Sequence, residues 1–326
     1  MSKKRVLSGM RPTGKLHLGH LTGALTNWKK FQEEYECFYF VADWHALSTE
    51  YANTALIKDN IKEMFIDWLS VGLDPEKATF FVQSHIPEHA ELHLLLSMIT
   101  PLPWLERCPT YKEQLRELKE RDLFTYGFLG YPVLQAADIL IYKADYVPVG
   151  QDQLPHLELT REIARRFNSL YEEILVIPQA KLTANPKLLG TDGRKMSKSY
   201  NNAIFLSDDP AVIKKKVQTM VTDPVRIKAN DPGHPDVCSV YSLYKVFNPH
   251  QVKEIRKKCE EGTIGCVACK KIIVEHLVAA LADIQAKRQE LGNKPGYIKE
   301  ILEKGMVKAR KVAAQTMAEV RKAMKL

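Results

Sequence analysis

The segment that decides the fold reads RVLSGMRPTGKLHLGH and covers residues 5–20. It contains an apolar, strand-like run (Arg5–Met10), then a Gly/Pro loop, then a helical stretch from about His17. Farther along the chain, Cys37–Ala42 and Thr79–Gln83 have the composition of buried strands, with a helical stretch between them. Strands that alternate with helices predict βαβ units, so we expect an α/β protein built on a doubly wound parallel sheet.

The length and the second half of the chain indicate a second domain. A chain of 326 residues is about two domains long. From about Asp209 to Leu291 the sequence reads mainly helical, and Pro295-Gly296 marks its end before a last basic helix. We expect an α/β domain at residues 1–190 with the C-terminal helix, residues 295–326, packed back on it. A mobile loop and a helical domain are expected at residues 191–294.

The composition excludes several classes of protein. Hydrophobic residues make up 45% and charged residues 26% of the chain, which excludes disordered, collagen-like and coiled-coil proteins. Apolar runs stay well below the roughly 18 residues of a membrane helix, and the N-terminal one is too short for a secretory signal. We therefore expect a cytoplasmic protein without a membrane partner. The formal net charge of +8 favours a polyanionic partner.

The string His17-Leu18-Gly19-His20 opens the first helix at the carboxyl end of a strand. Ligands bind at this edge of parallel sheets, where a helix N-terminus offers free N–H groups and a partial positive charge. Histidines three residues apart share one face of the first turn, so both imidazoles can donate hydrogen bonds to phosphate oxygens. Gly19 would let a flat purine approach the backbone. The alternative is two ordinary polar histidines beside a helix cap.

A second candidate for phosphate binding is the loop GTDGRKMSKS at residues 190–199. Its glycines indicate a mobile loop, and Lys195 and Lys198 carry compact charges that can move onto a triphosphate. The alternative is a solvated basic loop. The string Lys-Met-Ser-Lys-Ser is, however, far more specific than a generic basic run.

Together the two motifs resemble those of the class I aminoacyl-tRNA synthetases. Four strings between them resemble bacterial tryptophanyl-tRNA synthetases: VADWHAL at residues 41–47, LERCPTYKE at 105–113, YPVLQAAD at 131–138 and VPVGQDQ at 147–153. This resemblance implies a Rossmann-like catalytic domain with an inserted helical anticodon-binding domain. It also implies the activation of tryptophan with ATP and Mg²⁺, followed by transfer of the amino acid to tRNA(Trp).

The resemblance implies roles for individual residues, none of which has to act as a nucleophile. The residues expected to act on the phosphates during catalysis are His17, His20, Lys195 and Lys198. Further contacts to ATP are expected from Arg11, Gly19, Gly150, Gln153, Met196 and Ser197. Contacts to tryptophan are expected from Leu7, His45, Tyr131, Gln135, Asp138 and Val149. The family also implies a homodimer whose interface lies around Leu92–Leu129.

Asp138 is the residue expected to select the amino acid. An indole N–H is only a donor, so a buried carboxylate is its natural partner, and such a site rejects analogues that lack the donor. Two alternatives remain open. The carboxylate can be a helix cap or part of a structural ion pair. Tyrosyl-tRNA synthetases place Tyr, Gln and Asp at comparable spacing, so Tyr131, Gln135 and Asp138 fit either substrate. Arg11 stands where many family members carry Gln, which would alter the contact to the substrate carboxylate.

Four of the six cysteines fall within 32 residues, in the pattern Cys238-x20-Cys259-x6-Cys266-x2-Cys269. Such sets hold zinc or an iron–sulfur cluster, and the alternative is four unrelated buried thiols. A subset of tryptophanyl-tRNA synthetases resembles this pattern and carries a 4Fe-4S cluster, so we expect that cluster, with zinc as the alternative. Its expected role is to clamp helices that present basic residues to the anticodon loop. Nearby candidates for phosphate contact are Lys214, Lys215, Lys216, Arg226 and Lys228.

Overall fold

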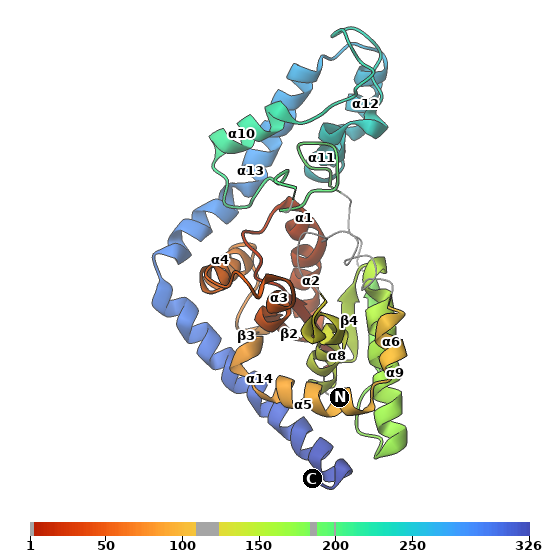
Figure 1. Ribbon diagram of the computed structural model, residues 1–326. Coiled ribbons are helices and arrows are strands. Elements are labelled where there is room, and N and C mark those ends of the chain that lie inside the picture. Colours follow the sequence, from red (N-terminus) through yellow and green to blue (C-terminus); the bar gives the residue numbers. More distant parts are fainter. Residues whose placement is uncertain (1–2, 109–123, 183–187, 199) are drawn as a thin grey trace.

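The computed structural model describes residues 3–108, 124–182, 188–198 and 200–326 (Figure 1). Ser199 and residues 109–113 of the LERCPTYKE string lie outside the described residues. Five strands form one parallel sheet in the order β3-β2-β1-β4-β5. They are β1 (Arg5–Met10), β2 (Glu36–Val41), β3 (Ala78–Val82), β4 (Tyr146–Val149) and β5 (Gln179–Leu182). The order reverses between β1 and β4, as in doubly wound folds, and this confirms the expected α/β class.

Helices connect the strands and continue beyond them. Those before β4 are α1 (Leu18–His20), the π-helical η1 (Leu21–Leu25), α2 (Thr26–Glu34), α3 (Asp43–Glu50), α4 (Ile57–Ser70), the 3-10 turn η2 (Gln83–His85), α5 (Glu88–Ile99), α6 (Leu102–Glu106) and α8 (Tyr126–Ile141). Those after it are η3 (Gln151–Gln153), α9 (Leu154–Leu170), α10 (Pro210–Thr219), η4 (Pro235–Val237), α11 (Ser239–Phe247), η5 (Pro249–Gln251), α12 (Val252–Glu260), α13 (Cys266–Gly292) and α14 (Pro295–Met324).

Helices cover both faces of the sheet, because successive side chains of a strand point to opposite faces. Along β2, Tyr39 and Val41 join the core formed with α2 and α4. Phe38 and Phe40 join the second core, formed with α5, α8 and α9. Every residue of β2 after its first is buried, which explains why the strand reads as a continuous apolar run.

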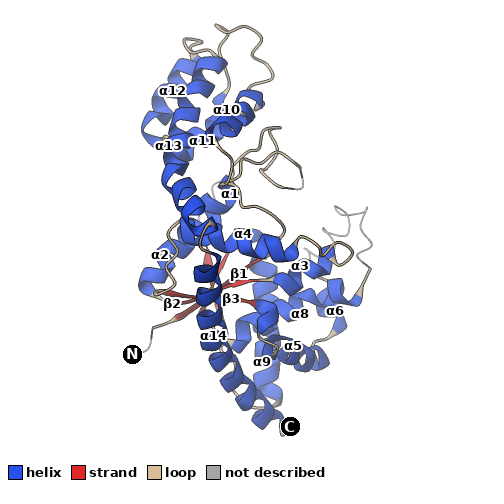
Figure 2. Ribbon diagram, turned by 90° about the vertical axis from the view of Figure 1, so that its left-hand side faces the viewer, coloured by secondary structure: helices blue, strands red, loops and turns tan. Residues whose placement is uncertain are grey.

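The C-terminal helix α14 packs against β3, α5 and α8 (Figures 1 and 2). At the crossing of α14 and β3, a Cβ atom on Gly305 would lie 1.8 Å from the carbonyl oxygen of Phe80. Glycine at this position therefore allows the helix to approach the strand closely.

A helical region formed by α10, α11, α12 and the first part of α13 lies beyond the sheet (Figure 1). Its interior is apolar, with Ile213, Leu243, Ile255 and Ile273 buried. Helix α13 leaves this region and packs against α4 of the α/β part. Within the described part of the chain, no helix is both long and apolar enough to cross a membrane.

Candidate active site

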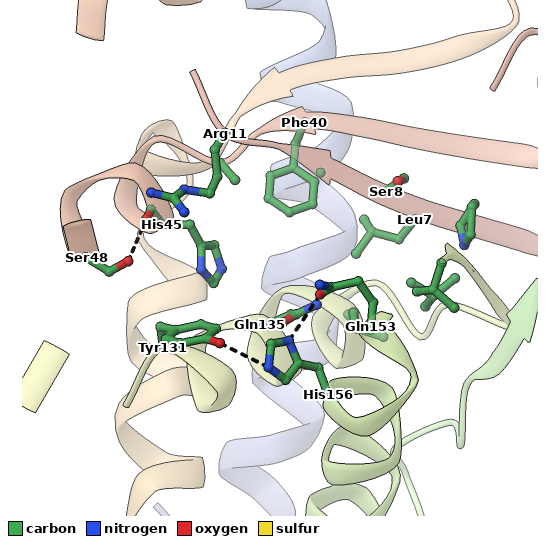
Figure 3. Close-up of a pocket in the computed structure, with 16 residues that line it drawn as sticks. Leu7, Ser8, Arg11, Phe40, His45, Ser48, Tyr131, Gln135, Gln153 and His156 are labelled. Carbon is green, nitrogen blue, oxygen red and sulfur yellow. Dashed lines mark hydrogen bonds between the residues drawn. The ribbon is translucent and has the colours of Figure 1, made fainter. Parts of the chain in front are cut away.

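A cavity of about 330 Å³ opens at the carboxyl ends of β1 and β4, where the strand order reverses (Figure 3). Its volume is within the range of small-molecule sites. The residues expected from the sequence that line it are Leu7, Arg11, His45, Tyr131, Gln135, Val149 and Gln153. The lining residues that the sequence did not suggest are Ser8, Gly9, Phe40, Ala42, Ser48, Ile139, Val147, Pro148 and His156. Asp138 and Gly150 are not among the lining residues.

A chain of hydrogen bonds crosses one wall of the cavity (Figure 3). The ring nitrogens of His156 lie 3.0 Å (Nε2) from the Tyr131 hydroxyl and 3.2 Å (Nδ1) from Gln153 Oε1. Since the amide oxygen can only accept, we assign the proton to Nδ1, so that Nε2 accepts from the Tyr131 O–H. Burial, with His45 nearby, lowers the pKa of His156 to about 4, so the ring is neutral near pH 7. His156 follows Gln153 by one helical turn of α9, and this spacing is the sequence signal for it.

Arg11 brings a positive charge to the mouth of the cavity. It lies near His45 and Ser48 (Figure 3), and its Nη2 donates a hydrogen bond to Thr49 Oγ1 on α3. A guanidinium held in this way suits a carboxylate or phosphate, because its donors form a planar fork.

Asp138 lies behind His45, buried on α8 with 1% of its surface exposed. His45 Nε2 lies 2.8 Å from its Oδ2. Burial alone would raise the pKa of Asp138, but hydrogen bonds from His45 and His89 outweigh it and hold the pKa below its usual value. Asp138 is therefore a carboxylate near pH 7, and His45 stands between it and the cavity.

His17 and His20 form a reciprocal cap at the start of α1, with ring centroids 3.9 Å apart. The Nδ1 atom of His17 accepts from Gly19 N at 3.1 Å, and that of His20 accepts from His17 N at 3.1 Å. Both imidazoles are neutral near pH 7, because burial first and nearby charged groups second lower the pKa of His17 to about 4 and that of His20 well below 6.5. With Nδ1 used as an acceptor, the proton sits on Nε2, which leaves both rings as donors. A Cβ on Gly19 would lie 2.9 Å from the His17 ring, so this glycine also makes room for the cap.

The structure brings the downstream lysine loop to the first loop. Lys198 Nζ lies 2.9 Å from Gly14 O and 3.5 Å from Thr13 Oγ1. Lys195 is exposed and lies close enough to lower the pKa of His17 electrostatically. The backbone that follows this loop pairs with the start of α1, since Leu18 N donates to Ile204 O at 3.0 Å. The lysine loop and the histidine motif therefore lie close together.

Between the two lysines, Met196 and Ser197 have structural contacts. Met196 is 4% exposed and belongs to the apolar core, and Ser197 N donates to Asn202 Oδ1 at 2.7 Å. In this conformation the methionine anchors the loop, and the lysines on either side of it stay outside the apolar core.

A partly buried ion pair joins the end of α13 to α4 and to the loop before α1. Arg288 of α13 donates to Asp67 of α4, and also to Glu63 at 2.7 Å. The other oxygen of Asp67 accepts from Leu16 N at 3.3 Å, directly before His17. This chain of contacts joins segments more than 200 residues apart and has no local sequence signal.

The four cysteines of the expected metal site lie directly before α11 (Cys238), in α12 (Cys259) and at the start of α13 (Cys266 and Cys269), and all are free thiols. Nη1 of Arg226 lies 3.8 Å from Cys259 Sγ and 3.9 Å from Cys266 Sγ. Cys269 Sγ lies 3.6 Å from the Tyr244 hydroxyl, and its burial raises the thiol pKa to about 11. Among the residues described, however, no group of three or more His, Cys, Asp or Glu side chains is arranged to hold a metal ion.

Comparison with known proteins places the chain in a family. The family model described as "tRNA synthetases class I (W and Y)" matches residues 2–282. The tryptophan–tRNA ligase of Thermotoga maritima is 53% identical over 325 residues, which cover 99% of each chain. That of Aquifex aeolicus is 47% identical over 393 residues, covering 99% of this chain and 100% of the relative.

Solved structures agree. The tryptophanyl-tRNA synthetase from Campylobacter jejuni complexed with ADP and tryptophane has a TM-score of 0.88 and 36% identity, covering 99% of this chain and 100% of that one. The tyrosyl-tRNA synthetase from Archaeoglobus fulgidus shares the fold at 22% identity, with a TM-score of 0.67. The chain therefore belongs to the class I aminoacyl-tRNA synthetases, and within them to the tryptophan–tRNA ligase family.

Proposed function

We propose that the protein activates tryptophan with ATP and transfers it to tRNA(Trp). One observation carries the proposal: the lysine loop contacts the loop before the histidine motif, and that same loop, through Arg11, lines a cavity of about 330 Å³. In the first step a carboxylate oxygen of tryptophan attacks the α-phosphate of ATP, and pyrophosphate leaves. In the second step a ribose hydroxyl at the 3′ end of tRNA attacks the carbonyl carbon of the adenylate, and AMP leaves.

At the phosphate end, side chains bind and orient the nucleotide. Nε2–H groups of His17 and His20 donate to phosphate oxygens, while Lys195 and Lys198 follow the negative charge that develops on pyrophosphate. Such preorganised donors account for most of the rate gain in phosphoryl chemistry. Mg²⁺ supplies further charge neutralisation when bound with ATP, and it takes phosphate oxygens and waters as ligands. This fits a described site in which no carboxylate cluster is arranged for a metal ion.

At the amino-acid end, we assign the α-ammonium group to the Tyr131 and Gln153 wall. The Tyr131 hydroxyl donates to His156, so its oxygen lone pairs are free to accept from the ammonium group. We assign the carboxylate to Arg11 and the slot for the side chain to Leu7, Gln135 and Val149, all of which line the cavity. Asp138, reached past His45, accepts the indole N–H.

Pyrophosphate exchange into ATP, measured with each protein amino acid in turn, tests this function. We expect exchange with tryptophan, followed by charging of tRNA(Trp) from total tRNA. Exchange with tyrosine alone would show a tyrosine enzyme, and exchange with no amino acid would refute the synthetase function.

We also propose that the anticodon of tRNA is bound by the helical domain, residues 191–294, and that residues 1–190 and 295–326 form the catalytic domain. The basic side chains that support an anticodon-side contact are Lys214, Lys215, Lys216, Arg226 and Lys228. A cytoplasmic location fits a chain whose six cysteines are all free thiols. Charge reversal of Lys214 and Lys215 should raise the KM for tRNA and leave pyrophosphate exchange unchanged.

We propose a 4Fe-4S cluster, with zinc as the alternative, held by Cys238, Cys259, Cys266 and Cys269. The arrangement of the sulfurs lies outside metal-binding geometry here, so the support is chemical: four free thiols and an Arg226 guanidinium that can offset thiolate charge. Bound there, the group would cross-link the helices of this region. Protein purified without oxygen should show broad visible absorption and about four irons per chain. Stoichiometric zinc would favour the alternative, and neither metal would refute the site.

We further propose a homodimer that buries the exposed apolar side chains of Leu94 and Met98 on α5, Leu102 on α6 and Tyr126 on α8. These residues lie within the expected interface segment, of which residues 109–123 are outside the described part. Met98→Lys should convert a dimer to a monomer in sedimentation analysis, whereas Met98→Leu should not.

A further inference from the structure

Behind the tryptophan cavity, Asp138 receives three donors that come from three different elements. His45 on α3 is one of them, as described above. His89 on α5 contributes Nδ1, 2.6 Å from Oδ1. Gln83 in η2 contributes its amide Nε2, 2.8 Å from Oδ1 and 2.9 Å from Oδ2. Both His89 and Gln83 are 0% exposed.

The orientation of each of these two donors is fixed by a further bond. Nε2 of His89 lies 2.8 Å from the Tyr142 hydroxyl, whose pKa burial raises well above its usual value, so this hydroxyl keeps its proton. The carboxylate of Asp138 can only accept, so Nδ1 of His89 is the donor in the bond between them. The proton of His89 is thereby placed on Nδ1, facing the carboxylate. Gln83 Oε1 accepts from Trp44 N at 3.2 Å, which directs the amide NH₂ toward Asp138.

The carboxylate of Asp138 has no unoccupied acceptor position for the indole N–H. Each carboxylate oxygen offers two acceptor positions. Those of Oδ1 are used by His89 and Gln83, and those of Oδ2 by Gln83 and His45. Of the three donors, His45 alone lines the cavity. An incoming N–H can therefore reach Oδ2 only by replacing His45.

We propose that His89 and Gln83 are positioning residues for indole recognition, and that His45 is the exchangeable donor that gives up Oδ2 to the indole N–H. This rests on the proposed role of Asp138 as the indole acceptor. The two fixed donors hold the carboxylate charged and oriented in an apolar core, where an unpaired charge would be costly. An analogue without the N–H would displace His45 and leave Oδ2 with one hydrogen bond fewer, and nothing would compensate for that loss.

The experiment compares tryptophan with β-(benzothiophen-3-yl)alanine, in which sulfur replaces the indole N–H. The readout is the ratio of the two kcat/KM values in pyrophosphate exchange. His89→Leu and Gln83→Leu each remove one fixed donor, and each should lower this ratio at least about tenfold. His89→Asn is the matched control, because its amide N–H can replace Nδ1 and should retain most of the ratio. The KM for ATP and the thermal unfolding midpoint report whether the fold is intact.

The proposal is overturned if both substrates lose activity equally in His89→Leu and Gln83→Leu, since a purely structural role predicts that result. Asp138→Asn separates this failure from failure of the proposed function. A high ratio in Asp138→Asn would mean that Asp138 is not the acceptor. A ratio that collapses in Asp138→Asn but persists in both Leu variants would refute the positioning role alone.

Discussion

The two ends of the proposed active site, the tryptophan end and the phosphate end, are built in opposite ways. At the tryptophan end, Asp138 is 1% exposed and its donors come from packed elements of the core. At the phosphate end, Lys195 is exposed, and Lys198 rests on oxygens of the first loop, Thr13 and Gly14. The donors around Asp138 are therefore in place before substrate binds, whereas the charges of Lys195 and Lys198 are carried on a loop.

This difference fits the two tasks that we propose for these residues. The enzyme selects one amino acid because the wrong substrate side chain leaves a buried polar group of the protein without a hydrogen bond. This selection requires that the buried group keep its position. Stabilising pyrophosphate as it departs depends on charge where negative charge grows, so cations on a movable loop suit it. Variants at each end of the site can test this contrast.

Asp138→Ala should have the largest effect, because it removes the indole acceptor and leaves His45, His89 and Gln83 without their common partner. We expect tryptophan-dependent pyrophosphate exchange to fall about 10³-fold or more. ATP should still bind, since the histidine cap lies at the other end of the site. Equilibrium dialysis measures ATP binding, and steady-state kinetics measure tryptophan-dependent exchange. Unchanged exchange kinetics would show that Asp138 has no role in the mechanism.

Lys198→Ala should lower kcat about 10²- to 10³-fold, the usual cost of losing one transition-state charge contact. The KM for tryptophan should change little, because the lysine contacts the phosphate end. Lys299→Ala, an exposed lysine on α14, is the matched control and should keep full activity. A loss expressed mainly in the KM for tryptophan would contradict the division of the site into two ends.

Arg288→Met should lower kcat about tenfold, a smaller effect because Arg288 acts through Asp67 on the loop before His17. The same change leaves a buried carboxylate without its cation, so the free energy of unfolding should also fall. Arg288→Lys keeps the charge and should recover most of both losses. Full activity in Arg288→Met, in spite of a lower unfolding midpoint, would show that the ion pair serves stability alone.

The pH profile gives the smallest and most specific effect. Burial first, together with the nearby Arg11 charge, lowers the pKa of Lys198 to about 8 in the free enzyme. The cation is therefore lost as pH rises through about 8, and kcat/KM for ATP should fall above that value. Lys198→Arg should move this fall to higher pH, because a guanidinium keeps its proton. An identical profile in both proteins would assign the ionisation to another group.

The sequence predicts the parts of this molecule that depend on local pattern. Strands β1, β2 and β3 lie within one residue of the expected bounds, because buried parallel strands are continuous apolar runs. Strand β5 was not predicted, because its sequence, QAKL, is partly polar and the strand lies at the edge of the sheet. Gln83, expected as the last residue of a strand, instead follows β3 and turns toward Asp138.

What the sequence could not predict depends on contacts between distant segments. His89 is a polar residue at the start of α5, and its burial depends on α8, which packs against this helix. The contact from Arg288 to Asp67 joins helices far apart in the chain. Asp138 was expected at the wall of the cavity, and its place behind His45 depends on how α3 packs on α8.

If the first histidine motif and the distant lysine loop act on one nucleotide, their contributions to catalysis are coupled, and a double-mutant cycle measures this coupling. The cycle measures kcat for tryptophan-dependent pyrophosphate exchange in His20→Ala, Lys198→Ala and the double variant. We predict that the double variant loses far less than the product of the two single losses, because groups that act as a unit are not additive. Strictly multiplicative losses would show that the two motifs act independently, and would contradict the account.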